Sequence, residues 1–566
     1  MNSLAKYEYR PVPPAAFTAL GIAMFSCLLG LFLSLALFPP TAWRGDSAVA
    51  VTAADLWTNA LADGLVEALS AGDLSRELLP RLIGIAVAML ASGWLAFRMR
   101  HHATPVVDGR EHYEGLQLIK GKAAIANAND ALATEQNPLD RTIQWIPRVA
   151  IPRIREVRNL LILGAIGSGK TRIILYILDQ LVGRLLRNPG SDYGLFVHDT
   201  TGEILDGFPM ADGAFAVLNP DRPGLWAWAL GRDFADDLDC VSAADQIIHQ
   251  TGEAFWGKGG ATLFAGCMIV CKAQHARNWG AAQLYEACLR DPKLLKEEFE
   301  EHYEPAAGLI EFDAAGELSK TTVSFLLTFR ASVLRVLRPL AHAWADVPAD
   351  RQFSFGDWVL GSNPRQPKVV IVQRCGRHPE MSAAWIGMVM DFITAAIGDT
   401  RLPVSQTRIR TFMLDEAPAL GKLRRWSDLL DTGRNKGVST VAAIQDVAQF
   451  KRIYGDAAPS IFQRFGSKVI CAQTQGPETA ELANETIGKR CVLDDEPTTS
   501  TERGPAGRTE RSSTTSRRQE VPIVRPEYLA YRLGVSNRRV KGLVIGFGDI
   551  LEVAWPLRIW RKRRRA

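Results

Sequence analysis

A short segment of this chain has the residue pattern of a phosphate-binding loop. Residues 164–171 read Gly-Ala-Ile-Gly-Ser-Gly-Lys-Thr, with an apolar run before them at 160–163 and another after them. Glycines let the backbone wrap around phosphates, so that successive N–H groups and a helix N-terminus point at them. Lys170 would then neutralise the β- and γ-phosphates of a nucleotide, and the Thr171 hydroxyl would bind Mg²⁺. The alternative, a chance glycine-rich turn, is disfavoured by the strand-like run before the loop and the helix-like run after it.

The pattern therefore predicts ATP and Mg²⁺ as ligands. The residues expected to hold the nucleotide are Gly164, Ala165, Ile166, Gly167, Ser168, Gly169, Lys170 and Thr171.

A second segment supplies the carboxylates that such a loop needs. Residues 410–414 are mainly apolar and are followed directly by Asp415 and Glu416. A carboxylate at the end of a strand can bind Mg²⁺, so we expect Asp415 to share the metal with Thr171. Glu416 suits the role of the general base, which polarises the attacking water. A strand that ends in two solvated acids is the alternative, and the pairing with the loop at Lys170 favours the catalytic interpretation.

A long stretch of different composition separates these two segments. Residues 221–361 are rich in tryptophan at their start and then mainly helical in pattern, and a strand-like run resumes at 368–373. We therefore expect an α/β nucleotide-binding domain in two parts, 101–220 and 362–556, around an inserted all-helical domain. The helical patterns lie at 261–276, 281–289 and 321–340.

Two apolar runs near the N-terminus predict a membrane anchor over residues 1–100. Residues 15–38 carry no charge and are long enough to span a bilayer, and residues 82–97 form a second, shorter run. A signal peptide is the alternative for the first run, but the run is too long and no clean cleavage site follows it. Because basic residues flank the two runs on their outer sides, both termini are expected in the cytoplasm, with a small periplasmic loop between the spans.

The overall composition narrows the class of protein. The chain has 566 residues, 47% hydrophobic and 22% charged, which excludes a wholly disordered, collagen-like or coiled-coil protein. Its net charge is +5, and six of its cations fall in the last nine positions, so the rest is close to neutral. The eight cysteines have no metal-binding spacing and fit a reduced compartment.

Together these residues resemble the type IV secretion coupling proteins, the TraD/TraG-type ATPases of bacterial conjugation. The resemblance covers the membrane hairpin and roughly residues 151–556. Beyond the two nucleotide motifs it rests on Gly433-Arg434-Asn-Lys-Gly437, the strand that ends at Gln445, residues 450–455 and 465–471, and Phe255-Trp256-Gly-Lys.

The resemblance implies a RecA-like motor with an inserted all-helical domain, which works as a ring of six subunits at the bacterial inner membrane. The ring would couple a relaxase–DNA complex to the secretion channel, so single- and double-stranded DNA, the relaxosome and channel proteins are implied partners. Arg434 matches the family's arginine finger, which reaches the γ-phosphate of a neighbouring subunit, and Gln445 would sense that phosphate. Lys170, Glu416, Arg434 and Gln445 thus form the expected catalytic set. From local sequence alone, a surface arginine and a glutamine that caps a strand remain alternatives.

One segment departs from the family pattern. Many relatives carry an Asp-Pro-Lys-Gly-Glu type run where this chain reads Asp-Thr-Thr-Gly-Glu at 199–203. The lysine is missing, which puts its role in doubt, and Asp199 is left as a candidate outer-shell residue.

Other functions stay open at this point. A coupling ATPase that delivers protein effectors needs the same motor and is not separable by sequence. A non-hydrolysing membrane scaffold is disfavoured because the full catalytic set is present. A chromosome-segregation pump typically carries a longer membrane region and a winged-helix end, and neither is evident.

Two C-terminal stretches have unusual composition. Residues 494–519 are rich in Thr, Ser and Arg, which predicts a flexible loop whose arginines either contact nucleic acid or are simply solvated. Residues 555–565 interleave aromatics with cations, and the basic tail at 557–566 could contact DNA phosphates, contact anionic lipid, or serve only as a solubilising end.

Overall fold

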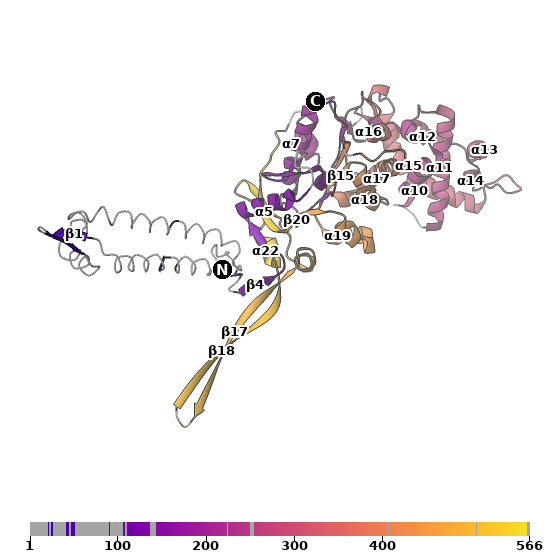
Figure 1. Ribbon diagram of the computed structural model, residues 1–566. Coiled ribbons are helices and arrows are strands. Elements are labelled where there is room, and N and C mark those ends of the chain that lie inside the picture. Colours follow the sequence, from indigo (N-terminus) through magenta and orange to yellow (C-terminus); the bar gives the residue numbers. More distant parts are fainter. Residues whose placement is uncertain are drawn as a thin grey trace. The chain divides into compact units, whose positions relative to one another are not determined.

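The structure is a computed structural model of the chain (Figure 1). It describes residues 41–44, 47–50, 106–107, 110–135, 143–222, 225–249, 254–405, 407–504 and 507–562. Apart from isolated positions, the expected spans at 15–38 and 82–97 lie outside the described residues. Within the described part, one helix, α17 (Pro379–Gly398), is long and apolar enough to cross a membrane, and 72% of its apolar stretch is buried inside the fold.

The chain divides into two compact units. The first comprises Met1–Gly115 and Lys489–Val521 and contains a four-stranded sheet in the order β18-β17-β4-β3. Where we expected a flexible loop, the structure has two long strands, drawn as an extended ribbon in Figure 1. Threonine favours extended backbone, and pairing the two segments satisfies their N–H and C=O groups without an apolar period. The strands are β3 (Val106–Val107), β4 (Arg110–Glu114), β17 (Lys489–Gly504) and β18 (Gly507–Pro522), and a separate hairpin joins β1 (Thr41–Arg44) to β2 (Ser47–Ala50).

The second unit, Leu116–Gly488 with Pro522–Ala566, is built on an 11-stranded sheet. The order is β10-β13-β9-β14-β15-β8-β16-β20-β21-β5, with β19 paired to β20. From β10 to β16 all neighbours are parallel, and β20 joins β16 antiparallel. This mixed sheet confirms the α/β class. The strands are β5 (Leu118–Lys120), β8 (Leu160–Leu163), β9 (Tyr193–Asp199), β10 (Ala216–Leu218), β13 (Val369–Gln373), β14 (Ile409–Leu414), β15 (Val438–Ile444), β16 (Ser467–Ile470), β19 (Gly534–Ser536), β20 (Arg539–Phe547) and β21 (Asp549–Pro556).

Helices cover both faces of the parallel strands, which explains why these strands are apolar throughout. In β14, Met413 joins a core shared with α7 (Lys170–Arg187), whereas Phe412 and Leu414 join the core shared with α17 and α18 (Trp426–Asn435). The smaller elements of this unit are α5 (Gly121–Ala133), β6 (Ile143–Ile146), β7 (Val149–Ile151), α6 (Arg153–Glu156), α8 (Glu203–Gly207), α19 (Val447–Tyr454), α20 (Ala458–Gln463), α21 (Pro477–Glu481) and α22 (Pro526–Tyr531).

A helical segment separates β10 from β13. Two short parallel strands, β11 (Ala227–Trp228) and β12 (Gln352–Phe353), bring its ends together. Beside them the buried Asp233 carboxylate accepts hydrogen bonds from Trp228 Nε1 (2.7 Å) and Ser354 Oγ (2.5 Å). The helices are α9 (Leu230–Asp233), α10 (Asp237–His249), α11 (Ala254–His275), α12 (Ala281–Leu289), α13 (Pro292–His302), α14 (Glu304–Ala307), α15 (Lys320–Trp344) and α16 (Phe355–Leu360).

The C-terminal aromatic residues are packed against the fold. Trp555 is fully buried on β21. Trp560 lies on the turn after α8, and its indole N–H donates to Asp179 Oδ1 of α7 at 2.7 Å. A Cβ atom added to Gly207 would lie only 2.5 Å from the Cβ of Trp560. The tail therefore does not present these two aromatics as the exposed contacts that a DNA or lipid interface would use.

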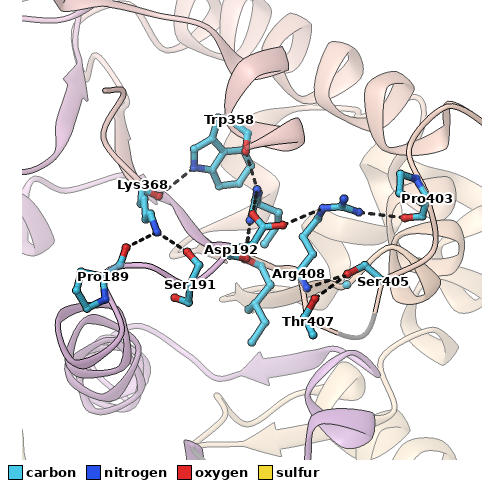
Figure 2. A network of polar contacts seen from close by, with 12 residues as sticks. Pro189, Ser191, Asp192, Trp358, Lys368, Pro403, Ser405, Thr407 and Arg408 are labelled. Carbon is cyan, nitrogen blue, oxygen red and sulfur yellow. Dashed lines mark hydrogen bonds and ion pairs between the residues drawn. The ribbon is translucent and has the colours of Figure 1, made fainter. Parts of the chain in front are cut away.

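At the amino edge of the parallel strands, polar side chains form the network drawn in Figure 2. Asp192 pairs with Arg410 Nη2 at 2.5 Å and with Arg408 Nε at 3.4 Å. Arg410 also donates from Nε to Trp358 O at 2.8 Å, and Lys368 Nζ donates to Pro189 O at 2.6 Å. This network ties the starts of β9, β13 and β14 to one another.

Candidate active site

Three of the expected site segments meet at the carboxyl edge of the parallel sheet. Gly164 follows β8, Asp415 follows β14, and Gln445 follows β15, which lies between those two strands. Because the carboxyl ends of neighbouring parallel strands share one edge, the loop, the acids and Gln445 are side by side. Gln445 is exposed there.

The loop between β8 and α7 requires its glycines. Gly167 and Gly169 have positive φ values of 76° and 97°. A Cβ on Gly164 would lie 2.5 Å from Ser168 Oγ and 2.8 Å from Cys471 Cβ, so a side chain at this position would clash with both residues. Since α7 begins at Lys170, its first N–H groups have no partner within the helix and are available to an anion.

Lys170 lies inside this loop and is only 7% exposed. Its ammonium group donates to the carbonyl oxygens of Gly164 (2.5 Å) and Ala165 (3.0 Å). Burial lowers the pKa of Lys170, while the nearby charges of Glu416 and Asp415 oppose that shift. The loop thus holds one cation next to two carboxylates.

The two carboxylates are crowded and poorly solvated. Burial raises the pKa of Asp415 to about 7, the charges of Asp199 and Glu416 add to the shift, and Lys170 opposes it. Burial also raises the pKa of Glu416 to about 7, against the effects of Lys170 and Gln445. Among the residues that the structure describes, neither Glu416 oxygen has a partner in hydrogen-bonding geometry.

These residues fit a nucleotide with Mg²⁺. One lysine does not neutralise two adjacent acids, Ser168 Oγ is buried without a partner in the described part of the chain, and the loop presents backbone N–H groups. In the described ranges, no cluster of three or more His, Cys, Asp or Glu residues could hold a metal by itself. Mg²⁺ bound with a nucleotide here would be held by Thr171 and Asp415 together with phosphate oxygens, and it would supply charge neutralisation of the phosphates.

Arg434 is placed away from this edge. It lies near the end of α18, and β15 starts four residues later, so Arg434 is at the amino edge of the sheet. The seven residues of β15 at about 3.3 Å each put it about 20 Å from the carboxyl edge. Its side chain is exposed and makes no polar contact with another described residue. The structure therefore does not bring Arg434 to the loop of its own chain.

Comparison with known proteins decides the family. Residues 144–545 match the family described as "Type IV secretion-system coupling protein DNA-binding domain". The chain belongs to this family. It is 26% identical over 398 residues to "Coupling protein TraD" of Escherichia coli strain K12, which covers 68% of this chain and 51% of TraD. The chain thus matches about half the length of that relative.

Solved structures of a coupling protein share the fold. "Bacterial conjugative coupling protein TrwBdeltaN70" in its unbound form superposes with a TM-score of 0.61 and 19% identity, over 80% of this chain and 95% of that chain. "Plasmid coupling protein TrwB in complex with ADP and Mg2+" gives the same score and identity, over 80% and 96%.

Sequence reasoning missed part of the site of this coupling protein. Asp199 Oδ2 accepts from Gln373 Nε2 (3.2 Å) and from the N–H of Leu205 (2.9 Å), so Asp199 also fixes the turn into α8. Arg374 follows β13, and its charge favours the ionised form of Glu416. No motif marks Gln373 or Arg374, and the only available signal was their place directly at or after the end of a strand.

His198 is a second residue that the sequence did not mark. It is fully buried in β9, and neither ring nitrogen has a partner among the described residues. Burial, helped by the charge of Arg374, lowers its pKa to about 3. His198 is therefore neutral in the folded coupling protein at any physiological pH.

Proposed function

We propose that this coupling protein hydrolyses ATP to drive a relaxase–DNA complex into a type IV secretion channel during conjugation. The observation that carries the proposal is the meeting of the glycine loop, Lys170 and the two buried carboxylates at one sheet edge. Membership of a family described by its DNA-binding domain supports DNA as the substrate.

Each residue of the site has a role in this proposal. Lys170 leaves its two loop carbonyls to neutralise the β- and γ-phosphates, and the loop N–H groups hold the remaining oxygens. Thr171 and Asp415 bind Mg²⁺. Glu416, whose oxygens have no partner in hydrogen-bonding geometry among the described residues, takes the proton from the attacking water. Gln445 senses the γ-phosphate from the strand between them. The TrwB structure with ADP and Mg²⁺ supports this choice of ligands.

Arg434 has its role in a ring, of six subunits in this proposal. Since it lies about 20 Å from the loop of its own chain, it is suited to reach the nucleotide of a neighbouring subunit. A cation supplied in trans stabilises the charge that develops on the transferring phosphoryl group. Hydrolysis then depends on assembly.

The proposed location is the bacterial inner membrane, with both termini and the ATPase domain in the cytoplasm. The apolar runs at 15–38 and 82–97 support it. The relaxosome, single- and double-stranded DNA and the channel proteins are the proposed partners.

The test is the ATPase rate of the full chain in lipid nanodiscs, with and without single- or double-stranded DNA. We expect the rate to increase with DNA and with protein concentration. Glu416→Gln should bind nucleotide normally but lose turnover. A rate that is unaffected by either form of DNA would favour delivery of protein effectors, and a preparation that binds nucleotide without hydrolysing it would favour the scaffold.

A further inference from the structure

The turn that follows Arg434 is held in one conformation. Gly437 has a φ of 82°, and a Cβ there would lie 2.1 Å from the carbonyl oxygen of Arg408. Its own carbonyl oxygen accepts from the N–H of Arg410 at 3.0 Å. The end of α18 is therefore pressed against the start of β14, and the position of Arg434 depends on this junction.

One side chain bridges the junction. Arg153 Nη2 donates to Arg408 O at 2.5 Å and to Gly437 O at 3.0 Å. Arg408 is itself fixed, because its guanidinium pairs with Asp192 (3.4 Å) and donates to Pro403 O (3.1 Å), as Figure 2 shows. A single guanidinium nitrogen thus joins the turn after Arg434 to the anchored amino edge of the sheet.

The second terminal nitrogen of Arg153 lies near an acid that is hydrogen-bonded to α7, the helix that follows the phosphate-binding loop. Arg153 Nη1 lies 3.6 Å from Glu156, which also receives two hydrogen bonds from Arg184 of α7 at 2.9 and 3.0 Å. Burial favours the neutral form of Glu156, but Arg184 and Arg153 outweigh it and lower the pKa. Glu156 is therefore a charged partner that orients Arg153 and connects it to the helix that begins at Lys170.

We propose that Arg153 is a positioning residue for Arg434. The inference rests on the proposed role of Arg434 in a neighbouring site. The polar contacts of Arg153 within the described residues are with Arg408 O, Gly437 O and Glu156, none of which belongs to the nucleotide loop or its acids. Arg153 acts by fixing the turn that follows Arg434. Without Nη2, two carbonyl oxygens lose a charged donor and the turn can shift. A misplacement of about 1 Å costs up to about 100-fold in turnover.

The first measurement compares Arg153→Ala with Arg155→Ala in the full chain. Arg155 is the matched control, since it is buried on the same short helix but donates to Gly546 O (2.5 Å) and pairs with Glu135 (2.5 Å). We expect Arg153→Ala to lower kcat about 10- to 100-fold with unchanged KM, and Arg153→Lys to recover part of it. Arg155→Ala should keep kcat. Equal loss of kcat in both variants would overturn the proposal.

The decisive measurement uses mixed rings. Arg153→Ala subunits keep an intact loop, and Lys170→Ala subunits keep an intact finger, so mixing them should restore turnover. A defect confined to the subunit's own nucleotide site would show no recovery. If Arg153→Ala does not yield folded protein, Arg153→Gln, which keeps a neutral donor, takes its place in the same assay.

Mixed rings of Arg434→Ala and Lys170→Ala subunits distinguish failure of the Arg153 inference from failure of the proposed trans role of Arg434. If turnover recovers in rings that mix Arg434→Ala with Lys170→Ala but not in rings that mix Arg153→Ala with Lys170→Ala, only the positioning role of Arg153 is overturned. No recovery with either pair, in rings that remain assembled, overturns the trans role of Arg434 and this inference with it.

Discussion

The two edges of the parallel sheet differ in how their buried polar side chains are paired. At the amino edge, Asp192 pairs with two arginines, and the Arg410 side chain is 3% exposed with its donors used. At the carboxyl edge, Glu416 is only 9% exposed, yet neither oxygen has a partner in hydrogen-bonding geometry among the described residues. Unpaired buried groups cost stability, and a buried carboxylate without a partner beside a phosphate-binding loop is a candidate for pairing by a ligand. Within one subunit, the amino edge acts as the frame and the carboxyl edge holds the groups suited to chemistry on a nucleotide.

The largest expected effect separates function from stability at the carboxyl edge. Lys170→Ala should lower turnover at least about 1000-fold, because the phosphates lose their buried cation. The melting temperature should change little, since among the described residues Lys170 donates to two carbonyls of its own loop and to no other element. ATPase rate, nucleotide binding and thermal denaturation are measured on one preparation. Unfolding of the variant would contradict the division between the two edges.

The reverse experiment is made at the amino edge. Arg410→Ala removes a buried guanidinium that contacts Asp192 and Trp358 O, so it should destabilise the fold by about 2–4 kcal/mol. Turnover per folded molecule should stay within about threefold of the parent below the melting temperature. Thermal denaturation gives the first quantity and ATPase rate at low temperature gives the second. Lost turnover in a fully folded variant would mean that the Asp192 network also helps to place Arg434 for the neighbouring subunit.

Acid should destabilise the fold through His198, whose ring nitrogens have no partner among the described residues. Its pKa is about 3 in the folded chain and ordinarily 6.5, so the unfolded chain binds more protons between these values and stability is lost as the pH falls below 6.5. At pH 5 the loss is about 2 kcal/mol. His198→Leu should remove this part of the acid sensitivity in melting temperatures recorded from pH 7 to pH 5. Identical pH curves for the parent and the variant would show that His198 finds a partner in solution.

The smallest expected effect is the pH dependence of catalysis. Glu416 must be ionised to take a proton, and its raised pKa of about 7 means that the ionised fraction grows about tenfold between pH 6 and pH 8. The value of kcat/KM should therefore rise about tenfold over that range. The residual rate of Glu416→Gln serves as the control and should be flat. A flat profile for the parent enzyme would show that the carboxylate is already ionised by a partner.

The meeting of the glycine loop and the two acids at one sheet edge could be predicted from the sequence because each pattern is local. A glycine loop after a strand and two acids after another strand each report on a few adjacent residues, and parallel pairing brings them together. Gln373 and Arg374 could not be predicted, since their place beside Asp199 and Glu416 depends on strand order. The strands β17 and β18 were missed because polar threonine-rich segments lack the apolar alternation that marks a half-buried strand.

The close contact between Trp560 and Gly207 should constrain how these two positions vary among members of the family. The tryptophan can occupy its place on the turn after α8 only because residue 207 has no side chain. Relatives that keep a tryptophan at the position of Trp560 are therefore bound to keep glycine at 207, and those that lose one are released from conserving the other. In a deep alignment these two positions, more than 350 residues apart, should change together.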